Sequence, residues 1–271
     1  MNVALIGYGY WGSIAARAIA RVATLKWILE TDPANRHQAA LDWEPWGTRI
    51  GDDLGIASGA EAVWVATPTA DHETRVRQAL DLGLHVLCEK PFVFQPDTAI
   101  DLCNQAKEAK LALMVGHLTL HTGRQEAFTE LWRRPGGVSR VVAIRRNEEA
   151  SLSDGSVLFG IGPHEVSPLV NVMGGPTDVT CWGTEHRVEC ELRFNGKHEA
   201  VIELDWLAEE RYRAFTCDDT LVNMPDVMEP LLREAEVFKS VVEGNDREKW
   251  RWDAFQTTSA LWELERCRTS P

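Results

Sequence analysis

Three glycines near the start of the chain are spaced as in a phosphate-binding turn. Gly7, Gly9 and Gly12 follow an apolar stretch, Val3–Ile6, and precede an alanine-rich segment, Ser13–Ala23. In such a turn the first glycine permits the tight bend, the second lets the backbone approach a pyrophosphate, and the third lets helix and strand pack closely. The helix N-terminus adds unpaired N–H groups. We therefore expect a dinucleotide site, which also includes Tyr8, Tyr10 and Trp11.

An acidic residue follows this turn at the spacing that a ribose contact requires. Asp32 lies twenty residues beyond Gly12, after the apolar stretch Lys26–Leu29. A carboxylate there accepts hydrogen bonds from the ribose hydroxyls and repels a 2′-phosphate, so Asp32 favours NAD. Glu30 competes for this role, a solvated strand-end Asp32 is the alternative without a cofactor, and Arg36 leaves NADP open.

Two further segments follow apolar strands at positions where loops face a cofactor. Thr67 and Pro68, with His72, come after Ala62–Thr67, although a proline that merely ends the strand fits equally well. Glu89 and Lys90 come before Pro91 and after His85–Cys88. A lysine ammonium can hydrogen-bond a substrate oxygen and the neighbouring carboxylate can orient it, against the alternative of a solvated ion pair. We expect these five residues, Thr67, Pro68, His72, Glu89 and Lys90, at the cofactor.

Together these motifs resemble the glucose–fructose oxidoreductase / inositol dehydrogenase / MocA superfamily. The resemblance covers nearly the whole chain and is greatest to the sugar-nucleotide branch, whose members oxidise the 3-hydroxyl of UDP-N-acetylglucosamine-type sugars or their uronic acids with NAD. The motifs that carry it are Gly7–Gly12, Ala66-Thr67-Pro68 with His72, Glu89-Lys90-Pro91, Val115-Gly116-His117, Arg145-Arg146-Asn147, Gly162-Pro163-His164-Glu165 and Asp205-Trp206-Leu207.

The resemblance implies roles for two residues. Lys90 contacts the reacting hydroxyl and His164 acts as acid and base. An imidazole, with an ordinary pKa near 6.5, accepts a proton at neutral pH, whereas an ammonium near 10.4 must be strongly desolvated to do so. We therefore expect His164 to be the general base and Lys90 to polarise the alcohol, with the reverse assignment open. His117, Arg145 and Asn147 are expected to complete the substrate site.

One position departs from the family pattern. The family has an aspartate four residues before the histidine, whereas this chain has Gly160. Glycine can neither orient a substrate nor tune an imidazole, so the departure puts the catalytic details in doubt. Glu165 keeps a charge beside His164 but projects differently.

Other polar residues are less specific. His117 and His121 are four residues apart, but without a third ligand nearby we expect no metal. Bidentate arginine suits a diphosphate or carboxylate, and the arginines available in the second half for such a contact are Arg124, Arg145, Arg146, Arg211 and Arg213.

Composition limits the partners. The chain has 271 residues and a net charge of −13, which disfavours nucleic acid and anionic membranes. No apolar run approaches the length of a membrane span, and a strand that begins near Met1 leaves no room for a signal peptide. Six scattered cysteines without a Cys-x-x-Cys pair indicate reduced thiols. We expect a cytoplasmic protein.

The elements that position these residues form two domains. Alternating strands and helices over residues 1–116 predict an α/β Rossmann domain with a doubly wound parallel sheet. Residues 117–271 predict an α+β domain for substrate binding and oligomerisation, with a mostly antiparallel open sheet and a hairpin turn at Asn195-Gly196. One open sheet face suggests a homodimer or tetramer. Whether Cys190 or Glu191 points outward stays open.

These inferences lead to one main expectation and two alternatives. The main one is an NAD(P)-dependent dehydrogenase that acts on the hydroxyl of a sugar, one linked to a nucleotide. One alternative is a reductase of an imine, a polyol or a keto sugar on the same scaffold, since a fold does not decide its chemistry. The other is a non-catalytic NAD-binding sensor or partner protein.

Overall fold

The computed structural model describes residues 1–147, 155–222 and 229–269, which form two compact units. The first comprises Met1–Val93, Asp97–Gly116 and Leu231–Ala254. The second comprises Phe94–Pro96, His117–Pro230 and Phe255–Pro271. We expected every residue after Gly116 to lie in the second domain, but Leu231–Ala254 belong to the first. The reason is that the apolar face of a late helix completes the core of the first unit.

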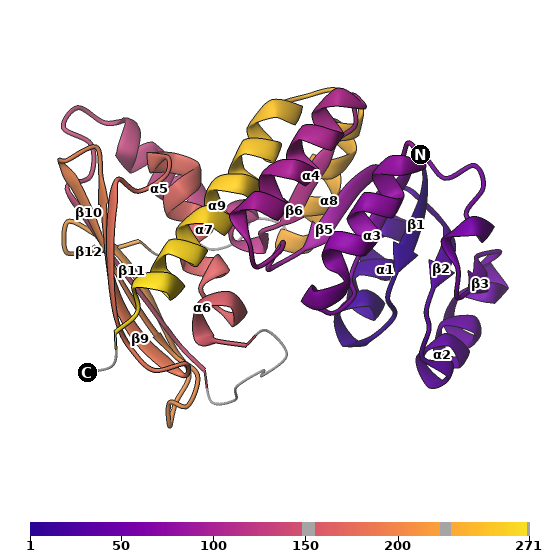
Figure 1. The fold of residues 1–271 in the computed structure, drawn as a ribbon, viewed down its shortest axis with the longest axis horizontal. Helices are drawn as coiled ribbons and strands as arrows, with labels where there is room; N and C mark the ends of the chain where they lie inside the picture. Colours follow the sequence, from indigo (N-terminus) through magenta and orange to yellow (C-terminus); the bar gives the residue numbers. More distant parts are fainter. Residues whose placement is uncertain (148–154, 223–228, 270–271) are drawn as a thin grey trace. The chain divides into compact units, whose positions relative to one another are not determined.

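The first unit is built on a six-stranded, fully parallel sheet (Figure 1). Its strand order is β3-β2-β1-β4-β5-β6, so the predicted doubly wound parallel sheet is confirmed. The central strands are buried on both faces, as parallel sheets covered by helices require. The strands are β1 (Asn2–Ile6), β2 (Thr24–Leu29), β3 (Arg49–Gly51), β4 (Ala62–Val65), β5 (His85–Glu89) and β6 (Leu113–Gly116).

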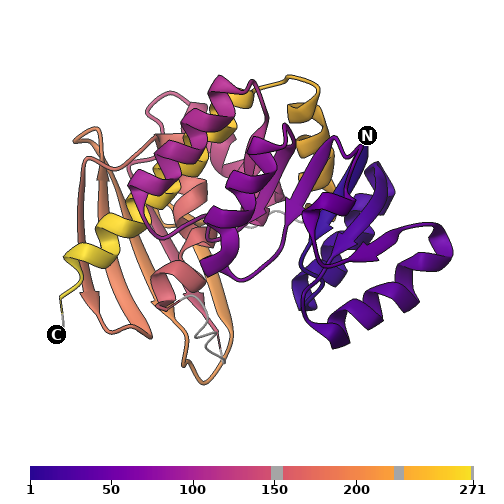
Figure 2. The same cartoon turned by 45° about the vertical axis from the view of Figure 1, so that its right-hand side comes forward.

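Helices cover both faces of this sheet (Figure 2). Residues of α1 (Tyr10–Val22), α2 (Pro33–Trp43) and α8 (Pro230–Val242) share one apolar core with the strands. The helices α3 (Thr69–Asp81) and α4 (Pro96–Glu108) follow β4 and β5, and α3 packs against both of those strands. Helix α8 contributes Ala235, Phe238 and Val241 to that core; burial of such a stripe is what holds an amphipathic helix in place.

The second unit contains a mixed six-stranded sheet of order β12-β11-β7-β10-β9-β8. The pair β7 and β10 is parallel and every other pair is antiparallel, so the mostly antiparallel sheet is confirmed with one exception. The strands are β7 (Arg140–Arg146), β8 (Asp178–Gly183), β9 (Arg187–Phe194), β10 (His198–Asp205), β11 (Tyr212–Cys217) and β12 (Thr220–Leu221).

The two faces of this second sheet differ. Along β9 the residues Cys190 and Leu192 are buried while Glu191 and Arg193 are exposed, which decides the orientation that the sequence left open. The buried face shares a core with α5 (Gly123–Arg133), α6 (Val157–Gly160), α7 (Pro163–Met173) and the C-terminal part of α9 (Arg247–Cys267). No helix in the described ranges is long and apolar enough to cross a bilayer.

The expected hairpin joins β9 and β10. Asn195 and Gly196 have φ of 50° and 66°, as a type I′ turn requires of both central residues. Lys197 donates its N–H to the carbonyl of Phe194, which closes the turn. This local prediction is confirmed.

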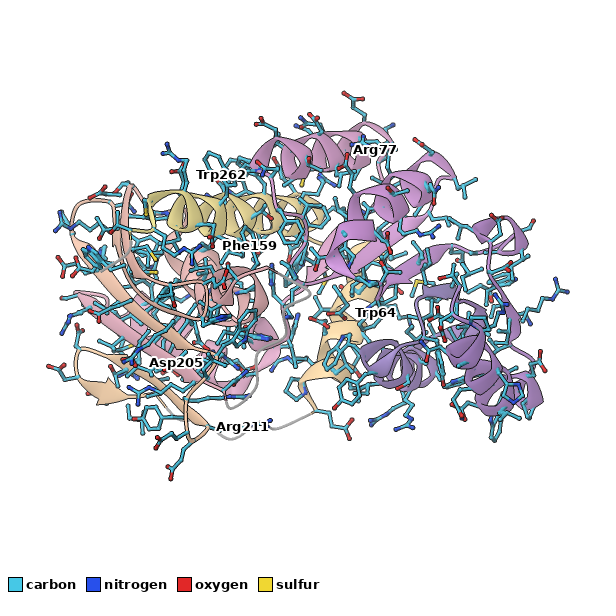
Figure 3. The ribbon with its side chains drawn as sticks, turned by 60° about the horizontal axis from the view of Figure 1, so that its bottom comes forward. Trp64, Arg77, Phe159, Asp205, Arg211 and Trp262 are labelled. Atoms are coloured by element: carbon cyan, nitrogen blue, oxygen red, sulfur yellow. The ribbon has the colours of Figure 1, made fainter. Side chains whose placement is uncertain are left out.

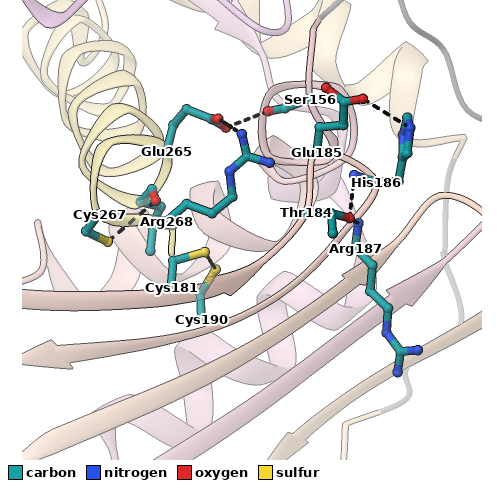
Figure 4. Close-up of polar contacts among 11 residues, drawn as sticks. Ser156, Cys181, Thr184, Glu185, His186, Arg187, Cys190, Glu265, Cys267 and Arg268 are labelled. Atoms are coloured by element: carbon teal, nitrogen blue, oxygen red, sulfur yellow. Dashed lines mark hydrogen bonds and ion pairs between the residues drawn. The ribbon is translucent and has the colours of Figure 1, made fainter. Parts of the chain in front are cut away.

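A polar contact attaches α9 to the start of α6 (Figure 4). The hydroxyl of Ser156 donates to Glu265, 2.6 Å away, and Arg268 pairs with the same carboxylate at 2.5 Å. Cys181 and Cys190 lie opposite each other on β8 and β9, with their sulfur atoms 2.6 Å apart. The thiol contact with Cys181, followed by burial, raises the pKa of Cys190. Cys190 therefore stays a thiol rather than a thiolate at neutral pH.

Candidate active site

The glycine loop between β1 and α1 has two structural glycines and one open position. Gly7 has φ of +92°, and a Cβ there would lie 2.6 Å from the carbonyl oxygen of Ala66. A Cβ on Gly12 would lie 2.1 Å from the carbonyl oxygen of Gly7. At Gly9 a Cβ would meet nothing within 4 Å. The loop therefore leaves free space above Gly9, where a ligand can approach the backbone.

A pocket of about 330 Å³ lies at this loop, at the carboxyl ends of β1, β2 and β4. Five residues predicted for the cofactor line it, namely Gly7, Gly9, Asp32, Thr67 and Pro68. Such a position, where the strand order reverses, is the usual ligand crevice of doubly wound sheets. The remaining polar lining consists of Glu30, Thr31, Asn35, Asp52, Asp71 and Arg75.

Glu30 and Asp32, the two competing carboxylates, have different positions. Glu30 is buried and accepts hydrogen bonds from the backbone N–H groups of Tyr8 at 2.6 Å and Asp32 at 2.8 Å. Glu30 therefore holds the backbone of the glycine loop through the N–H of Tyr8. Asp32 is exposed in the pocket and caps α2 through one oxygen, which accepts from the N–H groups of Ala34 and Asn35. Asp32 is thus placed to meet a ribose.

The charges of the pocket fit NAD better than NADP. Arg36, which left NADP open, donates to the carbonyl of Glu30 and to Asp52, each at 3.1 Å. Among the described lining residues, Arg75 is the only lysine or arginine, against four carboxylates. A 2′-phosphate would meet the carboxylates of Asp32 and Asp52, and Arg36 already donates to Asp52. NAD, whose pyrophosphate suits the open Gly9 and the N-terminus of α1, fits these residues.

Seven of the residues predicted to contact the cofactor are not among those that line this pocket: Tyr8, Tyr10, Trp11, Gly12, His72, Glu89 and Lys90. The hydroxyl of Tyr8 turns toward α2, where it donates to Asp42 and accepts from Trp43. Burial, and then the bond to Asp42, raise the pKa of Tyr8 to about 12. The Tyr10 side chain is 85% exposed. Sequence position alone could not show that the hydroxyl of Tyr8 bonds to α2.

His72 connects the two loops that were predicted to face the cofactor. Its Nε2 lies 2.9 Å from the carbonyl oxygen of Thr67, and its Nδ1 lies 2.9 and 3.0 Å from those of Pro91 and Phe92. Carbonyl oxygens only accept, so making both sets of bonds needs a hydrogen on each ring nitrogen. His72 therefore positions the segment after Lys90, whose peptide bond to Pro91 is cis.

Glu89 is buried beneath this segment and has an acidic neighbour that the sequence did not suggest. Trp64, labelled in Figure 3, donates its Nε1–H to Glu89 at 3.0 Å. Burial raises the pKa of Glu89, opposed by the bonds from Trp11 and Trp64 and by the charge of Lys90. Glu234 of α8 is fully buried close by, and burial, then the charge of Glu89, raise its pKa well above the ordinary range. Two carboxylates that share a buried site disfavour each other's ionisation.

In the second unit His164 lies in the first turn of α7 and is half-buried. Its backbone carbonyl accepts a hydrogen bond from Nη2 of Arg124, at 3.3 Å. The next residue, Glu165, is fully buried; it pairs with Nε of Arg145 at 2.7 Å and Nη1 of Arg124 at 3.2 Å. Glu165 therefore holds two arginines beside His164.

The glycine that departs from the family pattern has a structural reason. Gly160 lies at the end of α6, and a Cβ there would lie 1.8 Å from the indole ring of Trp206. Trp206 is itself 1% exposed, at the end of β10. An aspartate at position 160 cannot fit unless the indole moves, so Trp206 occupies the volume that an acidic side chain would need.

The other predicted substrate residues lie in the second unit. His117 and His121 are buried at either end of a short 3-10 turn, Leu118–His121. Asn147 follows directly after β7, and its backbone N–H donates to the backbone carbonyl of Asp205 at the end of β10. Within the described ranges, no group of three or more His, Cys, Asp or Glu side chains is arranged to hold a metal.

Comparison with known proteins agrees with the pocket. The model of the oxidoreductase family with an NAD-binding Rossmann fold matches residues 1–117.

Three relatives are similar in sequence. The chain is 25% identical over 237 residues to D-xylose 1-dehydrogenase (NADP(+)) 2 of Haloferax volcanii, covering 74% of this chain and 72% of that protein. It is 28% identical over 118 residues to UDP-N-acetylglucosamine 3-dehydrogenase of Acidithiobacillus ferrooxidans, covering 44% and 37%. It is 30% identical over 118 residues to 2,7-anhydro-N-acetylneuraminate hydratase of Escherichia coli, covering 44% and 32%. The last two matches span about a third of those relatives.

Solved structures share the fold over the whole length. A crystal form of the Acidithiobacillus ferrooxidans enzyme superposes with a TM-score of 0.88 at 18% identity, covering 99% of this chain and 97% of that one. A dehydrogenase from Thermus thermophilus in complex with NAD and UDP-GlcNAcA superposes with a TM-score of 0.82 at 19% identity, covering 100% and 97%. At these identities the likeness concerns the fold.

Proposed function

Since residues 1–117 match the model of the oxidoreductase family with an NAD-binding Rossmann fold, we propose that this chain is an NAD-dependent dehydrogenase that oxidises a hydroxyl of a nucleotide-linked sugar. The observation that carries the proposal is the acidic pocket at the open Gly9, which suits NAD. Relatives named for xylose, inositol and UDP-N-acetylglucosamine support a sugar or polyol as the substrate.

The first unit binds the cofactor in this proposal. Gly9 and the N-terminus of α1 receive the pyrophosphate, and Asp32 receives the adenosine ribose. Glu30 keeps the loop in place by holding the N–H of Tyr8. When bound, NAD supplies the hydride acceptor for oxidation of the alcohol.

Lys90 and His164 act on the substrate hydroxyl. Lys90 donates a hydrogen bond to the hydroxyl oxygen and stabilises the negative charge that develops there. His164 accepts the hydroxyl proton, since an imidazole is the side chain suited to accept a proton near neutral pH. His72 positions Lys90 through the carbonyls of Pro91 and Phe92. His117, Arg145 and Asn147 complete the substrate site, Arg145 as a cation fixed by Glu165.

The exposed face of the second sheet is the proposed surface for a homo-oligomer. Its central strands present Val142, Ile144 and Val201 between the buried residues of the opposite face. Partly exposed β-branched residues in the middle of an open sheet favour burial against a second copy of the chain.

Turnover with a substrate panel tests the proposed activity. Purified protein with NAD is offered sugars with and without a UDP group, and reduced nicotinamide is followed by absorbance. Lys90→Ala and His164→Ala should each lower kcat by roughly 10²–10⁴-fold. The exposed Lys26→Ala and His37→Ala serve as matched controls and should leave kcat unchanged.

Two results would contradict the proposal. Parental turnover in both active-site variants would remove Lys90 and His164 from the mechanism. Cofactor binding without turnover of any sugar would favour the non-catalytic NAD-binding protein, which Gly160 in place of the family aspartate makes the second candidate.

A further inference from the structure

An arginine-rich cluster lies on the helix-covered face of the second sheet, at the end of β7. Arg145 follows the buried Val141 and Ala143 at every second position of β7, so its side chain points to the same face as theirs. Arg213 of β11 stands directly opposite Arg145 in the antiparallel pair. Directly opposed residues share a face, and like charges there repel each other. Two cations are thus brought together by the register of the strands.

One buried carboxylate organises this cluster but does not neutralise it. Glu165 bridges Arg145 and Arg124 at 2.7 and 3.2 Å. Arg124 also stacks on the ring of Phe215, 4.9 Å from its centroid, and donates to the carbonyl of His164. Both guanidinium groups are therefore held in fixed orientations next to the proposed base.

Arg213 supplies the excess charge. Its partial removal from water, and then the charge of Arg145, lower the pKa of Arg213, while Glu165 raises it. The charges of Arg211, labelled in Figure 3, and of Arg124 lower it further. Glu165 is the carboxylate that raises the pKa of Arg213. Three arginines, Arg124, Arg145 and Arg213, therefore lie around one carboxylate, in a chain whose net charge is −13.

We propose that Arg124, Arg145 and Arg213 form a binding site for the diphosphate group of the substrate. With Glu165 counted, these three arginines keep an excess of two positive charges, which matches an oxyanion of two or more charges better than a single carboxylate. Guanidinium forks held in place recognise phosphate oxygens through paired hydrogen bonds. The site adjoins His164, because Arg124 bonds to its carbonyl. This inference rests on the proposed function, in that the diphosphate is taken to belong to the sugar substrate.

Binding of inorganic pyrophosphate, measured by calorimetry, tests the site. Arg213→Gln is the variant of choice because Arg213 is exposed and its loss leaves the Glu165 pairs in place. It should weaken pyrophosphate binding about tenfold or more, as loss of charge-assisted hydrogen bonds implies. Arg213→Lys, which keeps the charge, should retain part of the affinity. The matched control is Arg193→Gln, an exposed arginine of the opposite face, which should bind as the parent does.

The outcomes separate this inference from the proposed function. NADH binding is measured in the same variants by fluorescence and should not change, since Arg213 does not line the cofactor pocket. Equal pyrophosphate affinity in Arg213→Gln and the parent would overturn the site, even if a sugar is turned over. Sensitivity of glucuronate but not of pyrophosphate binding would overturn it in favour of a carboxylate. Weakened pyrophosphate binding in a chain that oxidises no sugar would support the site and contradict the dehydrogenase.

Discussion

At the scale of single residues, Gly160 and Trp206 form a complementary pair. The glycine exists because the buried indole fills the space in front of it. The family aspartate is therefore absent for a packing reason, and its electrostatic role cannot be supplied from position 160. A sequence shows only the missing carboxylate, because the residue that replaces its volume lies 46 positions away.

Gly160→Asp should lower the free energy of unfolding by about 3 kcal/mol or more, because it both overpacks the core and buries a charge. Adding Trp206→Ala should restore part of that loss, so the double variant is less destabilised than the sum of the two single variants. Urea unfolding of the parent, both single variants and the double variant measures this coupling. Additive losses would show that the two side chains do not compete for the same volume.

At the scale of elements, several short or distant segments were missed by periodicity. Helix α2 is signalled by Asp32 as N-cap and Pro33 at the first helical position, a pattern that the cofactor interpretation of Asp32 obscured. Helix α5 begins after Thr122, which caps it. Helix α8 was expected, but its packing in the first unit was not. An amphipathic pattern predicts that a helix buries one face, without indicating against which sheet.

The burial of Glu234 on α8 predicts that the free energy of unfolding depends on pH. The raised pKa of Glu234 means that the folded chain keeps this proton to higher pH than the unfolded chain does. The stability contributed by the neutral form is complete below the ordinary value of 4.5 and is lost as pH rises toward the raised pKa. Glu89, with a raised pKa, and Lys90 share this environment.

Glu234→Gln should therefore gain stability over the parent as pH rises from 5 to 8, with a limiting slope of about 1.4 kcal/mol per pH unit for one group. Denaturant unfolding at several pH values measures it. Glu236→Gln, exposed on the same helix, is the matched control and should follow the parent. If the free energy of unfolding changed with pH equally in Glu234→Gln and the parent, Glu234 would not be the group that titrates.

At the scale of the whole molecule, the open face of the second sheet determines the expected assembly. Buried and exposed residues alternate along its strands. On the exposed face, charged residues such as Glu191 and Arg193 of β9 lie beside the apolar Ile144 and Val201 of β7 and β10. The sequence predicted an exposed face but could not assign its residues, because a shift of one position exchanges the two sets.

Ile144→Arg or Val201→Glu should convert the proposed homo-oligomer to monomers, because each places a charge in the middle of the apolar surface. Light scattering after size-exclusion chromatography measures the mass. Glu108→Lys, an exposed substitution on α4 of the first unit, should leave the assembly intact. An unchanged mass in both apolar-face variants would exclude this face as the contact.

The sequence alone was sufficient for features that depend on neighbours along the chain. The glycine spacing at Gly7–Gly12, the strand and helix periods and the turn at Asn195-Gly196 are local, because backbone sterics and alternation act over a few residues. Tertiary structure alone decided that Glu30 supports the loop while Asp32 faces the pocket, and that Glu234 lies beside Glu89. It also decided that Arg213 opposes Arg145. Those relations arise from strand register and helix packing, which bring together side chains whose separation in sequence carries no signal.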